Sequence, residues 1–283
     1  GLVSCSFQGH DKSTKVQVVK KKPVIKKVNR EILSVEGIDN LCNKIESSFK
    51  RYRWGKSKCR DEKWFSNNKS VLKTPLVWSV YGEKSENVET TLILCGVHGD
   101  EITPVKFCFD ILAHLNNVGA LGEESEHFKE DFKGKRIVIA PLVNPDSFFK
   151  KRPTRTNANG IDINRNLPTK DFKANAVKKW KSRYRSDKRR NPGVVAMSEP
   201  ESKFQVMLID KFKPRKIISV HSPLTMLDYD GPANANSGGQ IGQSANELLI
   251  TMSAKAKGYR IKNYPFFPGS LGNYAGNERH IPT

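Results

Sequence analysis

Three short polar segments in this sequence carry side chains suited to acid–base or metal chemistry. Each one directly follows an apolar run with the composition of a buried strand. The segments are His98-Gly99-Asp100-Glu101, Asn144-Pro145-Asp146 and His221-Ser222-Pro223. In open α/β sheets, the residues at the carboxyl ends of the strands build the site. We therefore expect His98, Glu101 and His221 to converge, although they lie far apart in the sequence.

A histidine and a glutamate three residues apart can point at one metal ion. Two imidazoles and a carboxylate with an open fourth position suit catalytic zinc, which polarises a carbonyl and makes a bound water more acidic. The spacing alone is weak evidence, because His127 and Glu130 repeat it in an acidic stretch that follows no strand. We expect that second pair to be solvated. Taken alone, His98 could equally be a loop histidine with satisfied hydrogen bonds.

Residues 157–166 (NANGIDINRN) are dense in Asn, Asp and Arg. Turn formation explains Asn159-Gly160, but it does not explain Asn164-Arg165 after an alternating pair of isoleucines. An arginine guanidinium binds a carboxylate through two hydrogen bonds, and an asparagine adds a neutral donor. The segment therefore predicts a carboxylate-bearing substrate beside the metal. A solvated basic loop is the alternative.

Strands and helices alternate from about residue 71 onward. The expected strands are 91–97, 136–140 and 216–220, and helical spacing occurs at 31–50, 104–115, 199–212 and 245–256. Apolar strands separated by helices predict an α/β sheet covered by helices on both faces. We expect a flexible basic arm over residues 1–30, a helical and loop extension over residues 31–70, and a catalytic-type domain over residues 71–283.

The net charge of +20 is concentrated in two blocks of this 283-residue chain. Residues 1–60 carry 15 Lys and Arg against 5 Asp and Glu, and residues 150–190 carry 15 against 3. Such blocks favour anionic partners such as nucleic acid, lipid or cell wall, and a solvated surface is the alternative. No nucleic-acid motif with interleaved aromatic residues accompanies either block, so nucleic acid is disfavoured. No apolar run approaches the roughly 20 residues of a membrane helix.

The first residues, Leu2-Val3-Ser4-Cys5, resemble the end of a bacterial lipoprotein signal. That resemblance implies export to the periplasm or cell envelope, with a lipid anchor on Cys5. A cytoplasmic protein is the alternative. Cys42 and Cys59 bracket a basic loop, and they could pair in an exported protein but would stay reduced in the cytosol.

As a set, these motifs resemble the zinc metallocarboxypeptidases related to carboxypeptidase A, over roughly residues 72–283. The resemblance implies a mixed, mostly parallel central sheet with helices on both faces. The closer similarity is to the murein peptide amidase branch. The segments that carry it are Gly96-Val97-His98-Gly99-Asp100-Glu101, Thr154-Arg155-x-Asn157-Ala158-Asn159-Gly160, Ser198-Glu199-Pro200-Glu201 and His221-Ser222-Pro223-Leu224.

The resemblance also implies a role for each candidate residue. One zinc ion would be bound by His98, Glu101 and His221. The carboxylate of the substrate would be held by Asn164 and Arg165. The tetrahedral oxyanion would be stabilised by Arg155, with Arg152 as the alternative. Tyr264 would close over the substrate and Leu271 would take the specificity-pocket position, although Tyr264 could instead be a packed aromatic residue.

The murein branch implies cleavage of a peptidoglycan peptide between γ-D-Glu and diaminopimelate. The family's general base is a glutamate on a strand shortly after a segment like His280-Ile281-Pro282-Thr283. We therefore expect the chain to be truncated before that strand. The alternatives are a carboxypeptidase for ordinary peptide C-termini, a non-catalytic wall-binding relative, and a deacylase of the aspartoacylase type. The last is disfavoured by Asn164-Arg165 and residues 198–201.

Overall fold

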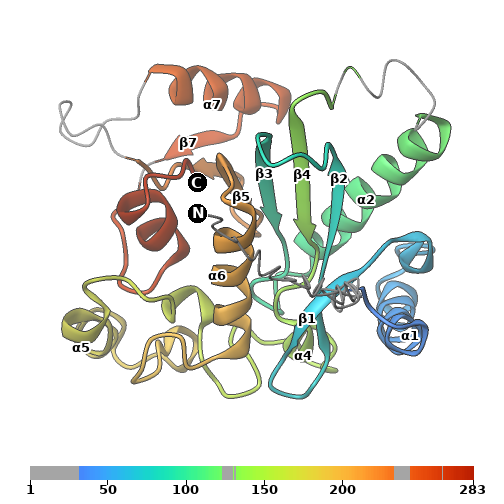
Figure 1. Cartoon of the computed structure of the whole chain (residues 1–283). Coiled ribbons are helices and arrows are strands. Elements are labelled where there is room, and N and C mark those ends of the chain that lie inside the picture. Colours follow the sequence, from blue (N-terminus) through green and yellow to red (C-terminus); the bar gives the residue numbers. More distant parts are fainter. Residues whose placement is uncertain (1–31, 123–129, 131, 233–242, 263) are drawn as a thin grey trace, which may run out of the picture. The chain divides into compact units, whose positions relative to one another are not determined.

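A five-stranded sheet forms the centre of the computed structural model, which describes residues 32–122, 130, 132–232, 243–262 and 264–283. The strand order is β1-β2-β4-β3-β5 (Figure 1). The strands are β1 (Phe65–Lys69), β2 (Pro75–Gly82), β3 (Glu89–Leu94), β4 (Lys135–Ala140) and β5 (Lys216–Ser219). Strand β2 is antiparallel to both neighbours, while β4, β3 and β5 are parallel. Four of the strands therefore point the same way, and the predicted mixed, mostly parallel sheet is confirmed.

The predicted strands appear where the apolar runs lie. Leu92 is paired with Val138 on one side and with Ile217 on the other, and all three side chains are buried. Strand β3 ends earlier than predicted, because Gly96 takes a positive φ of 60° that turns the chain out of the sheet. Strand β2 was not predicted, and neither was β1. The sequence of β1, FSNNK, has no apolar alternation, and pairing with β2 makes it a strand.

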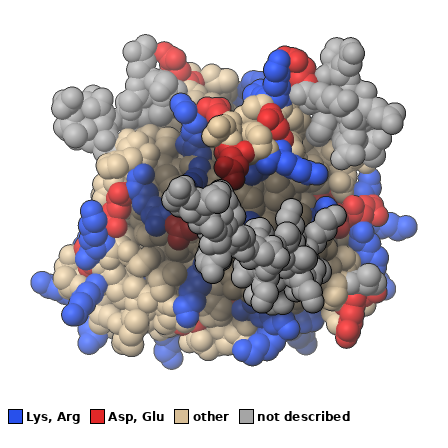
Figure 2. All heavy atoms as spheres, in the orientation of Figure 1, with Lys and Arg blue, Asp and Glu red and all other residues tan. Residues whose placement is uncertain are grey.

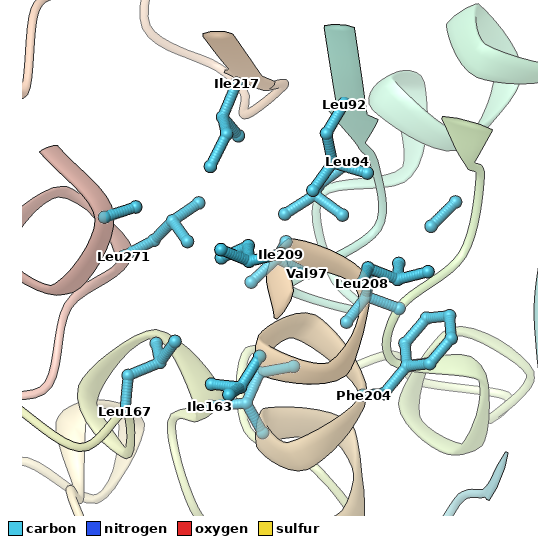
Figure 3. Packing of buried hydrophobic residues seen from close by; sticks show 14 of the residues in the cluster. Leu92, Leu94, Val97, Ile163, Leu167, Phe204, Leu208, Ile209, Ile217 and Leu271 are labelled. Atoms are coloured by element: carbon cyan, nitrogen blue, oxygen red, sulfur yellow. The ribbon is translucent and has the colours of Figure 1, made fainter. Parts of the chain in front are cut away.

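Helices cover both faces of the sheet. On one face, α1 (Val35–Tyr52) and α2 (Ile102–Gly122) pack against Val77, Ile93 and Ile139. On the other face, Phe204, Leu208 and Ile209 of α6 (Pro200–Phe212) pack against side chains of β3 and β5 (Figure 3). The sheet is thus buried on both sides, as its continuous apolar strands require.

Residues 31–70, predicted to be an extension, contribute to this core. Leu41, Ile45 and Phe49 of α1 are buried in the same cluster as the strand residues. Ser34 caps the helix by accepting a hydrogen bond from the backbone N–H of Gly37, as N-cap serines commonly do. Residues 1–30, Cys5 and His127 lie outside the described residues.

Several shorter elements connect the layers. The helices are η1 (Cys59–Asp61), α4 (Pro145–Phe148), η2 (Ile163–Arg165), α5 (Phe172–Tyr184), η3 (Lys188–Arg190), α7 (Gln243–Lys255) and the π-helical η5 (Gly272–Glu278). Strands β6 (Met226–Asp228) and β7 (Arg260–Lys262) form a small parallel sheet. Among the described helices, none has the length and apolarity to cross a membrane.

Two disulfides hold the helices on the face covered by α1 and α2. Cys42 of α1 is bonded to Cys59 of η1, and Cys95, just after β3, is bonded to Cys108 of α2. The sequence left the first pair open. It offered no sign of the second, because only the packing of α2 on the sheet brings Cys108 to Cys95. This second bond restrains the chain three residues before His98.

Replacing both Cys95 and Cys108 with alanine should lower the free energy of unfolding by about 3 kcal/mol, because the bond closes a loop spanning 13 residues in the unfolded chain. Urea unfolding of the oxidised protein followed by circular dichroism measures the change. Adding a reductant to the parent should lower its free energy of unfolding by more than the double substitution does. The reductant breaks both disulfides, whereas the substitution removes only Cys95–Cys108. An unchanged urea midpoint for the double variant would contradict the prediction.

Candidate metal and substrate site

The loops that follow β3 and β5 carry the three candidate metal ligands. His98 and Glu101 lie in the turn after β3, and His221 follows β5 by two residues. Because β3 and β5 are adjacent and parallel, both loops leave the same edge of the sheet. At Gly99 an added Cβ would lie 2.5 Å from the Cβ of Ser147, so only glycine lets this turn approach α4 so closely.

The structure brings the three predicted ligands together around the Glu101 carboxylate. Its Oε1 lies 2.8 Å from Nδ1 of His98, and its Oε2 lies 2.8 Å from Nδ1 of His221. One ligand atom from each residue lies within 4.8 Å of the other two. This compact set of two imidazole nitrogens and a carboxylate is the expected donor set for a catalytic zinc ion.

The outer nitrogen of each imidazole has a partner of its own. Nε2 of His98 lies 3.2 Å from Oδ1 of the buried Asp162, and Nε2 of His221 lies 3.0 Å from Oγ of Ser219. These contacts hold the rings so that both Nδ1 atoms face Glu101. Such outer partners orient metal-binding histidines and raise their basicity. The residues present therefore fit a zinc ion.

Both carboxylates of the site stay ionised. Burial alone would raise the pKa of Glu101, but hydrogen bonds with His221 and His98 hold it well below its ordinary value. Burial acts the same way on Asp162, and the charges of His98 and Arg155 outweigh it, so its pKa is also held well below the usual range. The site can therefore present negative charge to a divalent cation at neutral pH.

Arg155, the candidate for stabilising an oxyanion, lies against the metal ligands. Its Nε donates to Oδ2 of Asp162 at 2.8 Å, and one terminal nitrogen lies 3.4 Å from Oε1 of Glu101. The alternative, Arg152, is exposed. Of the two arginines, Arg155 is therefore the one that contacts the candidate metal ligand Glu101.

The candidate carboxylate-binding pair lies on η2. Oδ1 of Asn164 accepts a hydrogen bond from the backbone N–H of Leu271 at 2.8 Å. The guanidinium of Arg165 donates to the backbone oxygen of Asn164 and lies 4.7 Å from the ring centroid of Phe267. Gly269 has a φ of 73° and packs so closely on the Arg165 carbonyl that no side chain fits. A glycine turn therefore supports this arginine.

The two remaining candidates differ in exposure. The Tyr264 side chain is 46% exposed and its backbone N–H donates to Asp228, so it is not the packed aromatic residue of the alternative interpretation. Leu271 is 3% exposed, and its side chain lies in the core near Ile217 (Figure 3). The part of Leu271 that meets Asn164 is its backbone.

Sequence reasoning missed the buried acids that support the site. Asp162 is fully buried, and its position between Ile161 and Ile163 was the available signal. Nδ2 of Asn157 donates to Glu199 at 2.7 Å and to Glu201 at 2.9 Å. The motif at residues 198–201 therefore fixes the loop that carries Arg155 and Asp162.

Asp230 is a further acid that the sequence did not single out. Its carboxyl group packs against the Cα of Gly272, next to Leu271. Burial raises its pKa to about 7, the charge of Asp228 adds to this, and Arg165 opposes it. The Asp230 carboxyl is therefore partly protonated near neutral pH.

Comparisons with known proteins agree with this geometry. A family model described as zinc carboxypeptidase matches residues 34–263. The chain is 28% identical over 211 residues to murein peptide amidase A of Escherichia coli strain K12, covering 74% of each protein. It is 29% identical over 219 residues to murein peptide amidase A of Vibrio campbellii, covering 77% of the chain and 75% of the relative. The structure of bovine thrombin-activatable fibrinolysis inhibitor, in complex with tick carboxypeptidase inhibitor, matches with a TM-score of 0.57 at 20% identity, over 84% of this chain and 80% of that one.

Asp162→Asn should weaken zinc binding about 10- to 100-fold, because the amide cannot hold His98 as the carboxylate does. Competition with a chromophoric chelator measures the affinity. Asp187→Asn, which changes an exposed aspartate paired with Arg190, is the matched control and should bind zinc as the parent does. Equal affinities for the parent and Asp162→Asn would show that Asp162 does not support the metal ligand.

Asp230→Asn should stabilise the protein by about 4 kcal/mol at pH 8 and by only about 1 kcal/mol at pH 4.5. The pKa of Asp230 is about 7 in the folded protein and 3.8 ordinarily, so folding opposes ionisation of this carboxyl. The free energy of unfolding therefore falls as the pH rises from 3.8 to 7. Urea unfolding at both pH values measures the effect. The exposed Asp110→Asn should show no such difference, and an equal gain at both pH values would contradict the assigned cause.

Proposed function

Because this chain belongs to the zinc carboxypeptidase family, we propose that it hydrolyses an amide bond in a peptide derived from peptidoglycan. The bond we favour joins γ-D-Glu to diaminopimelate. The similarity to murein peptide amidases supports this substrate. The observation that carries the peptidase assignment is the link from the His98–Glu101–His221 group through Asp162 to Arg165. The backbone oxygen of Asp162 accepts a hydrogen bond from the N–H of Arg165 at 2.8 Å.

That link sets the direction in which a peptide lies. Asn164 and Arg165 would hold the free carboxylate of the leaving residue by charge-assisted hydrogen bonds. The scissile carbonyl would then lie at the metal ligands, where Arg155 can donate to its oxygen as negative charge develops. Zinc, when bound, polarises the carbonyl and makes water more acidic. Tyr264, which is 46% exposed, would close over the bound peptide, and the backbone of Leu271, which donates to Asn164, would border its specificity pocket.

The attacking water also needs a proton acceptor. In the part of the chain that the structure describes, the Glu101 and Asp162 carboxylates are engaged with His98, His221 and Arg155. As the family resemblance implies, the acceptor would be a glutamate.

We further propose that the protein works in an oxidising compartment, the bacterial periplasm or cell envelope, with a lipid on Cys5. The two disulfides support this, because such bonds are rare in the cytosol. The basic segments would contact anionic wall or membrane. On the face shown in Figure 2, Lys and Arg side chains are spread over the surface with Asp and Glu among them, and they do not form one patch.

A general carboxypeptidase is the second candidate, because Arg165 could hold the terminal carboxylate of any peptide. The test uses the native zinc-loaded protein. It is incubated with L-Ala-γ-D-Glu-diaminopimelate with and without a zinc chelator, and the products are read by mass.

Release of diaminopimelate that is lost on chelation is the expected result, and Glu101→Gln should reduce the rate at least 1,000-fold because a ligand is changed. Trimming of ordinary peptides without release of diaminopimelate would support the second candidate. Sedimentation with purified wall and no product from either substrate would indicate a non-catalytic wall-binding relative.

A further inference from the structure

A pocket beside Arg165 is not used by the chemistry described above. It is formed by α5, η3 and the chain before η5, and it is a small hollow that is open to solvent. Its walls combine cationic and aromatic side chains, and no acidic side chain is among the described residues that line it. The lining residues are Arg165, Ala176, Lys179, Trp180, Tyr184, Arg190, Pro192, Phe267 and Pro268.

The three cations of the pocket lack a matching set of counter-charges. Nε of Arg165 is buried and has no hydrogen-bond partner among the described residues. Lys179 makes no ion pair within the described part of the chain, and Arg190 has only the exposed Asp187 at 3.8 Å. Guanidinium and ammonium groups gathered without carboxylates attract an anion with several acceptor oxygens.

Aromatic side chains hold the two arginines of the pocket in place. The guanidinium of Arg165 lies 4.7 Å from the centroid of Phe267, and that of Arg190 lies 4.8 Å from the centroid of Tyr184. Trp180 is fixed by a hydrogen bond from its Nε1 to the backbone oxygen of Asp187. Cation–π contacts of this kind orient the donors before a ligand arrives. The ring faces also offer apolar surface to a carbon chain.

Crowding of like charges supports an anionic occupant. Burial lowers the pKa of Arg165, and the nearby charges of Arg155 and Arg190 lower it further, while Asp162 opposes them. A second negative group near Lys179 and Arg190 would relieve this repulsion. It would also leave Arg165 available to the carboxylate at the metal site.

We propose that this pocket binds a second acidic group of the leaving residue, with Lys179 and Arg190 as its donors. Arg165 lies between the two anion positions and takes the first carboxylate. The ligand class is therefore an amino acid with a carboxylate at each end of an aliphatic chain. This inference rests on the proposed function and adds a reason for preferring a dicarboxylic leaving residue.

Diaminopimelate and lysine make a matched pair of probes, because lysine has the same aliphatic chain and both amino groups but lacks the second carboxylate. Calorimetry on the full zinc-loaded protein should show diaminopimelate binding at least 10-fold more tightly than lysine. Hydrolysis of the γ-D-Glu-diaminopimelate and γ-D-Glu-lysine peptides should show the same preference in kcat/KM.

In the variant Lys179→Met with Arg190→Met, the preference should fall below about twofold, with lysine binding unchanged. Lys179→Arg should retain it. Lys173→Met with Lys181→Met changes two exposed cations of the same helix outside the pocket, and should behave as the parent does.

The proposal would be overturned if the parent bound diaminopimelate and lysine with equal affinity. It would also be overturned if the pocket variant lost affinity for both probes to the same extent. Inorganic phosphate binding that depends on Lys179 and Arg190, without any preference for diaminopimelate, would also overturn it and indicate a site for free phosphate. A preference in binding without hydrolysis of either peptide would support the pocket while contradicting the proposed function. Hydrolysis of both peptides without a preference for diaminopimelate would support the proposed function while contradicting the pocket.

Discussion

The buried carboxylate of Asp162 is the interaction on which the rest of the site depends. Its Oδ1 meets His98 and the backbone N–H of Asn164, and its Oδ2 accepts from Arg155. Its backbone oxygen accepts from Arg165. One residue therefore positions a candidate metal ligand together with Arg155 and Arg165, to which the proposed function assigns the reacting carbonyl and the substrate carboxylate. Such a buried charge is tolerated because it is paired and hydrogen-bonded on every side.

The sheet makes this arrangement possible. Strands β3 and β5 are parallel neighbours, so the loops carrying His98 and His221 emerge side by side (Figure 1). The Cys95–Cys108 disulfide and the close approach of Gly99 to Ser147 restrain the first loop. The Asn157 contacts with Glu199 and Glu201 restrain the segment that holds Asp162. The donors of the site are thus held by rigid elements before substrate binds, which favours catalysis over binding alone.

The fold explains part of the second basic block of the sequence, residues 150–190. Arg165, Lys179 and Arg190 all belong to residues 150–190, and the fold brings them around one pocket. On the face shown in Figure 2, Lys and Arg side chains are interspersed with acids. A pocket of fixed donors selects among small anions by shape and charge number, which a dispersed surface charge cannot do. The charge excess and the candidate specificity are therefore connected.

The sequence by itself determined the strands β3, β4 and β5, the helices α1, α2, α6 and α7, and the candidate metal ligands. Continuous apolar runs can be buried only in a covered sheet, and His98, Glu101 and His221 directly follow such runs. The tertiary structure alone decided the contacts between distant residues. The strand β1, the Cys95–Cys108 bond, the role of Asp162 and the pocket around Lys179 each depend on partners far away in the chain. Local residue pattern carries no information on such pairings, because packing in three dimensions creates them.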